Sequence, residues 1–180
     1  MFFIRIVTLI VTFTFILTPF HICAEESEFS EYEVKAGFMY NFPKFIEWPL
    51  DTFSDANKAI TLCVFGTDPF GKALGAIDNK TVQTRRLEIK YTGRSQDLKM
   101  CNILFISGSE KDNLSQILER MKSAPTLTIG DTKGFAQQGV MINFIIEQNK
   151  VGFEINTESA RRAKFTISSK LLKLAKTIYK

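Results

Sequence analysis

Residues 60–66 read Ile-Thr-Leu-Cys-Val-Phe-Gly, a short apolar run that a glycine closes. A run of this length, rich in β-branched residues, is typical of a strand that is buried on both faces. Asn102–Ser107 has the same character and predicts a second buried strand. Between the two, Leu87–Tyr91 alternates like a half-buried strand. Such strands are characteristic of layered α/β proteins, in which helices cover both sides of a sheet.

Strand and helix patterns alternate along the rest of the chain. Further strands are expected at Thr126–Ile129, Val140–Glu147 and Val151–Asn156, and the last two form a hairpin. Helices are expected over about residues 30–46, 68–77 and 112–121, and again from about residues 157 and 168. Pro43 lies inside the first of these and predicts a kink. We therefore expect one layered α/β domain, with a mixed sheet of about six strands flanked by about five helices.

The first 24 residues have the features of a secretory signal. Arg5 precedes the apolar run Ile6–Leu17, and Ala24 is a small residue at the expected cleavage point. An uncleaved anchor is the alternative, although this run is shorter than the roughly 18–20 residues that span a bilayer. Lipidation of Cys23 is a further alternative, which Ile22 disfavours because a small residue normally precedes that cysteine. We expect residues 1–24 to be a signal peptide, and residues 25–180 to form one exported domain.

Removal of the leader changes what chemistry the chain can carry out. His21 is the only histidine, so the mature chain has none. This excludes Ser-His-Asp and Cys-His catalysis and histidine-ligated metal sites. The mature chain has 22 basic and 19 acidic residues, a balance too mild to indicate nucleic-acid binding. We expect no enzymatic activity, no catalytic residues, no metal and no cofactor.

One segment imitates a phosphate-binding loop. Residues 66–73 match the first seven positions of that motif, after a predicted strand and before a predicted helix. Ala73, however, replaces the Ser or Thr that would hold Mg²⁺, and Pro69 removes a backbone N–H. Asp68 also places negative charge beside the phosphate. We interpret Asp68-Pro69 as the start of a short helix.

Cys63 and Cys101 remain in the mature chain and are predicted to form a disulfide. One lies in a buried strand and the other stands just before the second buried strand. Adjacent strands hold their Cα atoms within disulfide reach, and an even pair in an exported protein favours a bridge. Two buried free thiols are the alternative.

Two apolar regions are candidate binding surfaces. The first helix and its exit are denser in aromatic residues than one buried stripe can accommodate. The closing segment, interpreted as a helix, has apolar residues on one side and lysines mostly on the other. Docking of this segment on the sheet is the alternative to partner binding. The candidate partner-binding residues are Tyr40, Phe42, Phe45, Trp48, Leu171, Leu174 and Ile178.

The same regions carry a resemblance to a known family. Val34-Lys-Ala-Gly-Phe-Met-Tyr-Asn-Phe-Pro-Lys-Phe-Ile-Glu-Trp-Pro49 resembles the first block of the YfiR family of periplasmic proteins. The closing block, Ile167-Ser-Ser-Lys-Leu-Leu-Lys-Leu-Ala175, resembles its last block. Weaker matches lie between them, at 62–66, 68–71, 101–107, 139–143 and 153–156. Pro43 departs from the pattern, where a small helix-forming residue is expected.

The resemblance implies a function that composition does not show. YfiR-like proteins are periplasmic regulators, and the best understood member binds and represses the periplasmic sensor domain of an inner-membrane diguanylate cyclase, so the resemblance implies this function here. This lowers cyclic-di-GMP signalling and disfavours biofilm. An outer-membrane lipoprotein is a possible second partner, and a homodimer is expected. The family's second cysteine pair is missing, since Met141 and Val151 stand in that region. The alternative function is a periplasmic small-molecule sensor or carrier.

Overall fold

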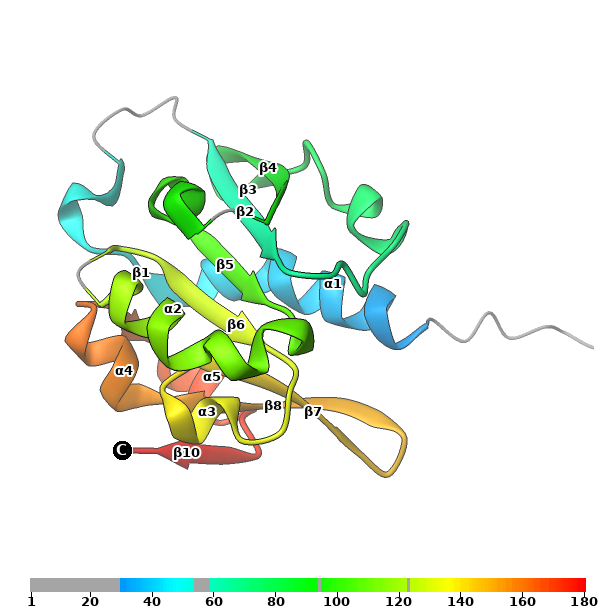
Figure 1. The fold of residues 1–180 in the computed structure, drawn as a ribbon, viewed down its shortest axis with the longest axis vertical. Coiled ribbons are helices and arrows are strands. Elements are labelled where there is room, and N and C mark those ends of the chain that lie inside the picture. The colour runs from blue at the N-terminus through cyan, green and yellow to red at the C-terminus, as the bar shows by residue number, and fades with distance from the viewer. Residues whose placement is uncertain (1–29, 54–58, 94, 123) are drawn as a thin grey trace, which may run out of the picture.

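The fold is built on ten strands, eight of which form one curled sheet (Figure 1). The computed structural model describes residues 30–53, 59–93, 95–122 and 124–180. The strands are β1 (Ile46–Glu47), β2 (Ile60–Phe65), β3 (Thr81–Val82), β4 (Arg85–Thr92), β5 (Ile103–Ile106), β6 (Leu127–Gly130), β7 (Ile142–Glu147), β8 (Lys150–Asn156), β9 (Thr166–Ile167) and β10 (Thr177–Tyr179).

The large sheet has the order β10-β8-β7-β6-β5-β2-β4-β3. Strands β4, β2, β5, β6 and β7 are parallel, whereas β8 is antiparallel to β7 and β3 is antiparallel to β4. The edge strand β10 runs parallel to β8. The parallel part starts in its middle and winds outward in both directions, which is the arrangement of a doubly wound α/β domain. The predicted mixed α/β sheet is confirmed.

Five α-helices and five short 3₁₀ turns connect these strands in the described residues. The helices are α1 (Glu31–Asn41), α2 (Leu114–Met121), α3 (Phe135–Gln138), α4 (Thr157–Arg162) and α5 (Ser169–Leu172). The 3₁₀ turns are η1 (Phe42–Phe45), η2 (Leu50–Phe53), η3 (Ala73–Ala76), η4 (Ser95–Met100) and η5 (Gly108–Asn113).

The sheet separates two apolar cores. Alternate residues of β2 illustrate the division, because Leu62 and Val64 belong to one core and Cys63 and Phe65 to the other. Helix α1 covers the first face, where Phe42 packs against aromatic residues of β7 and β8. Helix α2 covers the second face together with α3 and η4. Figure 1 shows α2 and α3 on the near side of the sheet and α1 behind it.

The first helix begins where its sequence predicts but is shorter than the expected range of residues 30–46. The Ser30 hydroxyl accepts a hydrogen bond from the Glu33 backbone, and the Glu33 carboxylate accepts one from the Ser30 backbone. Pro43 has no N–H to continue the helical ladder, so α1 ends at Asn41 and the chain turns through η1.

All six predicted strands are present, but the predicted number is too low. Strand β10 and the short β3 extend the main sheet at its two edges, and β1 pairs with β9 in a small separate ladder. Three of these four strands are only two residues long, and the fourth has three. Two residues are too few to show an alternating pattern, so the sequence could not reveal them.

The predicted closing helix starts where expected but is wrong in extent. Helix α5 ends at Leu172, and the chain then enters β10, where Ile178 pairs with Ile155 of β8. The Lys176 N–H donates to the Phe153 carbonyl at 2.9 Å and begins this pairing. β-branched and aromatic residues at 177–179 favour a strand, and the open edge of β8 supplies the partner groups.

The predicted helix over residues 68–77 is also wrong in extent. The Asp68 carboxylate accepts a hydrogen bond from the Phe70 N–H at 2.8 Å, which closes a local turn and does not cap a helix. Only the 3₁₀ turn η3 follows. Gly71 has φ +54°, a conformation that interrupts any helix starting at Pro69.

Candidate partner-binding site

The structure brings the two predicted binding regions together. Strand β1, which follows the aromatic first helix, pairs with β9, and Ile46 lies opposite Ile167. The Ser168 N–H extends this ladder by donating to the Phe45 carbonyl at 2.9 Å. Helix α5 follows directly and packs beside η1. Two segments far apart in the sequence therefore form one surface, which we call the junction surface (Phe45, Trp48, Ile167, Leu172).

All four residues of the junction surface are half-buried. Trp48 packs edge-on against Phe53 and Phe165, with ring centroids 5.3 Å apart in both pairs. These contacts fix the indole and leave part of it exposed. A fixed, partly exposed aromatic ring loses little conformational entropy when it binds a partner.

The other predicted binding residues have different surroundings. Leu174 and Ile178 are 62% and 39% exposed, which is unusual for large apolar side chains. Tyr40 is half-buried, and its hydroxyl donates to the Thr81 carbonyl at 2.7 Å. Phe42 and Leu171 are 0% and 2% exposed, so in this conformation they belong to the core and not to a binding surface. Their helical spacing is equally typical of a core stripe.

A groove of about 470 Å³ lies next to the junction surface, between α4, β9 and α5. Its apolar walls include Phe165, Ile167 and Leu172, and charged residues including Arg161 and Lys180 border it. The sequence prediction did not include Phe165 or Ile167. Their only signal is the alternation Phe-Thr-Ile over 165–167, which is too short to distinguish a strand from a loop.

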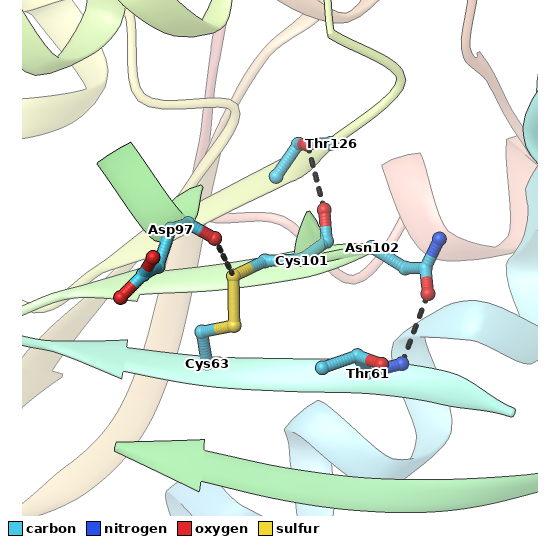
Figure 2. Close-up of a disulfide and its surroundings, with 6 residues drawn as sticks. All are labelled: Thr61, Cys63, Asp97, Cys101, Asn102 and Thr126. Atoms are coloured by element: carbon cyan, nitrogen blue, oxygen red, sulfur yellow. Dashed lines mark hydrogen bonds between the residues drawn. A yellow bond between two sulfur atoms is a disulfide. The ribbon is translucent and has the colours of Figure 1, made fainter. Parts of the chain in front are cut away.

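The predicted disulfide between Cys63 and Cys101 is present (Figure 2). The two Cα atoms are 5.7 Å apart, and both residues are buried in the second core. Next to it, the Thr126 hydroxyl donates to the Cys101 carbonyl at 2.7 Å, and the Thr61 N–H donates to the Asn102 side chain at 2.9 Å. The bridge therefore joins β2 to the turn that leads into β5.

The loop that imitates a phosphate-binding loop is occupied by the protein itself. The Thr67 N–H donates to the Ser109 hydroxyl at 2.9 Å, so this donor is already used. Gly66 has φ +91°, and a Cβ there would lie 2.5 Å from the same hydroxyl oxygen. Glycine at this position therefore permits close packing of two loops.

A buried charge ties α1 to the carboxyl end of β6. Lys35 is 3% exposed, and its ammonium donates to Asp131 at 2.8 Å and also pairs with Glu31. Burial by itself lowers the pKa of Lys35, but hydrogen bonds to both carboxylates outweigh it, so this pKa lies above its ordinary value. Burial, followed by the charge of Asp131, raises the pKa of the Tyr32 phenol. Every charge in this cluster has a partner, which indicates a structural role.

Within the ranges the structure describes, no group of three or more His, Cys, Asp or Glu residues is arranged to hold a metal ion. The same residues include no helix long and apolar enough to cross a bilayer.

The geometry defines a doubly wound α/β domain that presents a junction surface of aromatic and aliphatic residues. The family described as YfiR/HmsC-like matches residues 32–176, and the chain belongs to this family. The match covers both segments of the junction surface. A comparison with curated proteins finds no match.

Two solved structures resemble the fold. One is a conserved domain protein from Vibrio cholerae, with a TM-score of 0.52 and 10% identity over 82% of this chain and 60% of that one. The other is an ABC domain in complex with L-Trp from Streptococcus pneumonia, with a TM-score of 0.53 and 8% identity over 82% and 61%. The chain thus spans about three fifths of each, and at such low identity the likeness shows the fold alone.

Proposed function

We propose that this protein is a periplasmic regulator that binds and represses the periplasmic sensor domain of an inner-membrane diguanylate cyclase. Membership of the YfiR/HmsC-like family carries the proposal. The disulfide is consistent with an oxidising compartment. Residues 1–24, which we propose as the signal peptide, lie outside the described residues. The protein acts by binding and performs no catalysis.

The junction surface, with Leu174 and Ile178, is the proposed contact. Binding would bury apolar area that is now in water, at about 25 cal/mol per Å² before the costs of association. Selective binding to one conformation of the sensor domain lowers the population of the active conformation. Repression is therefore stoichiometric. A homodimer and an outer-membrane lipoprotein that competes for the regulator belong to the same proposal.

The test uses a strain that lacks this gene and carries plasmid-borne variants. Deletion is expected to raise the cyclic-di-GMP level, and the wild-type chain is expected to bring the level down again. The variant Leu174→Asp should leave the cyclic-di-GMP level high, because a charge in the contact must be desolvated when the partner binds. Met100→Asp is the matched control, since Met100 is 54% exposed but lies on η4 at the opposite face. Unchanged cyclic-di-GMP on deletion would count against repression, and equal behaviour of both variants would count against this surface.

The groove beside the junction surface favours a second candidate function, that of a small-molecule sensor or carrier. Its volume of about 470 Å³ is within the range of ligand sites, and its walls are largely apolar. The two functions separate by experiment. If the protein is only a sensor, a ligand should raise its unfolding temperature. The immobilised mature chain should then retain no membrane cyclase.

A further inference from the structure

A second groove lies on the opposite side of α4 and shares no residue with the first. It has a volume of about 320 Å³ and is formed by α2, α4 and the amino ends of β6 and β7. Leu118, Met121 and Met141 form its apolar part. Two of these side chains are thioethers, which adapt to ligands of different shape.

Two buried hydroxyl groups in this groove have protons to donate. The Thr128 oxygen accepts the Met141 N–H at 3.0 Å, and the Ser159 oxygen accepts the Arg162 guanidinium at 3.0 Å. Both residues are less than 9% exposed and line the groove. Among the residues that the structure describes, neither hydroxyl proton has an acceptor. Buried donors of this kind normally have an acceptor, so the groove is suited to a ligand that brings one.

The charge at the groove is only partly neutralised. Glu158 makes three hydrogen bonds to Arg161, at 2.9 to 3.0 Å, and only a longer contact of 3.9 Å to Arg162. Arg162 therefore keeps most of its charge available beside Ser159. Lys122 and Glu119 both line the groove and pair with each other at 3.3 Å, so they add little net charge to it.

Gly139 keeps the groove open at its centre. A Cβ at this position would lie 3.4 Å from Leu118 and 3.5 Å from the Ser159 hydroxyl. Gly139 also has φ +118°, a conformation that side-chain-bearing residues rarely adopt. The backbone itself therefore forms this wall, and space remains between the hydroxyl and the apolar residues.

We propose that this groove binds a small molecule that combines a carboxylate with an apolar body. The carboxylate accepts hydrogen bonds from Thr128, Ser159 and Arg162, and the apolar body contacts Leu118, Met121 and Met141. A planar carboxylate matches the guanidinium fork, which explains an arginine at this place. This site does not depend on the proposed repression of a cyclase.

The experiment titrates the mature chain, residues 25–180, with phenylacetate and octanoate while recording amide chemical shifts. Saturable shifts are expected at residues 139–141 and 159–163. Phenylacetamide, which has the same body without the charge, should bind at least about tenfold more weakly, because it loses the charge-assisted hydrogen bond to Arg162.

Two variants test the assignment. Arg162→Gln should weaken phenylacetate binding about tenfold, while Lys173→Gln, an equal charge change just after α5 and outside the groove, should leave it within about twofold. Ala163→Leu fills the groove without removing charge and should abolish binding at an unchanged unfolding midpoint. The proposal is overturned if neither carboxylate saturates, if the shifts map elsewhere, or if Arg162→Gln binds like the wild type.

Discussion

Lys35 is a buried cation, and three partner groups hold it in place. Its ammonium contacts Asp131 and Glu31 and lies 4.3 Å from the centre of the Tyr32 ring. A salt bridge of this kind adds little net stability, but removal of one partner leaves the other charge buried without compensation. The cluster therefore fixes the position of α1 relative to β6.

Replacement of Lys35 by Met should lower the free energy of unfolding by roughly 3 kcal/mol, because Asp131, only 10% exposed, then loses its cationic partner and keeps only the hydrogen bond from the Tyr32 hydroxyl. Lys44→Met is the matched control, since Lys44 is exposed. The contacts described for its ammonium are a hydrogen bond to the Asn41 side chain and a position over the Tyr40 ring. The control should lose less than about 0.5 kcal/mol. Urea unfolding at neutral pH measures both. Equal losses in the two variants would contradict the buried role.

The same cluster predicts alkaline sensitivity. The pKa values of Lys35 and Tyr32 are both raised in the folded protein, so the fold binds protons more tightly than the unfolded chain. Their contribution to stability is complete below the unfolded values of about 10 and is lost as pH rises through the raised values. Stability should therefore fall more steeply above about pH 10 in the wild type than in Lys35→Met. Parallel pH profiles would exclude this linkage.

The disulfide gives a third prediction at the residue scale. It closes a loop with a sequence separation of 38, which in the chain-entropy model is worth about 4 kcal/mol. The double variant Cys63→Ala/Cys101→Ala should lose up to that amount, and reductant should lower the stability of the wild type only. Denaturant unfolding with and without reductant measures this. If reductant destabilised the double variant as much as the wild type, the reductant would not act through this disulfide.

At the scale of elements, the predictable strands are those whose own residues define them. Ile60–Phe65 and Ile103–Ile106 are buried on both faces, so their composition alone indicates a strand. Strand β10 differs, because its residues form a strand only where the open edge of β8 offers hydrogen bonds. The apolar spacing that begins at Leu171 and Leu172 of α5 and continues to Ile178 fits one helix, and tertiary pairing makes residues 177–179 a strand instead.

Strand β10 can be tested by truncation after Lys176. The Tyr179 hydroxyl donates to Glu154 at 3.2 Å, and the Tyr179 carbonyl accepts the Thr157 hydroxyl at 2.9 Å, so both contacts disappear. We expect a loss of about 1–2 kcal/mol and faster hydrogen exchange at residues 153–156, whose edge becomes exposed. Secondary chemical shifts of residues 177–179 provide the control in the intact chain. Helical shifts there would disprove the strand.

At the scale of the whole molecule, the junction surface could not be read from the sequence. Two of its four residues, Phe45 and Trp48, could be predicted, because the aromatic density near them exceeds one buried stripe. Their meeting with Ile167 and Leu172 depends on a two-residue ladder between β1 and β9, which leaves no pattern in either segment. Phe42, predicted from the same aromatic density, and Leu171, predicted from the apolar stripe of the closing segment, are both buried. Periodicity cannot tell the core side of an element from a binding side.

Trp48 lies in the junction surface and is therefore a fluorescence probe of the place where the two ends of the domain meet. Trp48 is the only tryptophan, and it contacts Phe165, which belongs to the first core with residues of β2, β5 and β8. Because both cores share one sheet, β9 and α5 should not detach before the rest unfolds. Trp48 fluorescence and far-ultraviolet circular dichroism should therefore give the same midpoint in urea. Phe165→Ala should lower the free energy of unfolding by about 3 kcal/mol, and the two urea midpoints should fall by the same amount as each other. A fluorescence transition that precedes the loss of circular dichroism would instead show that the junction surface opens independently of the sheet.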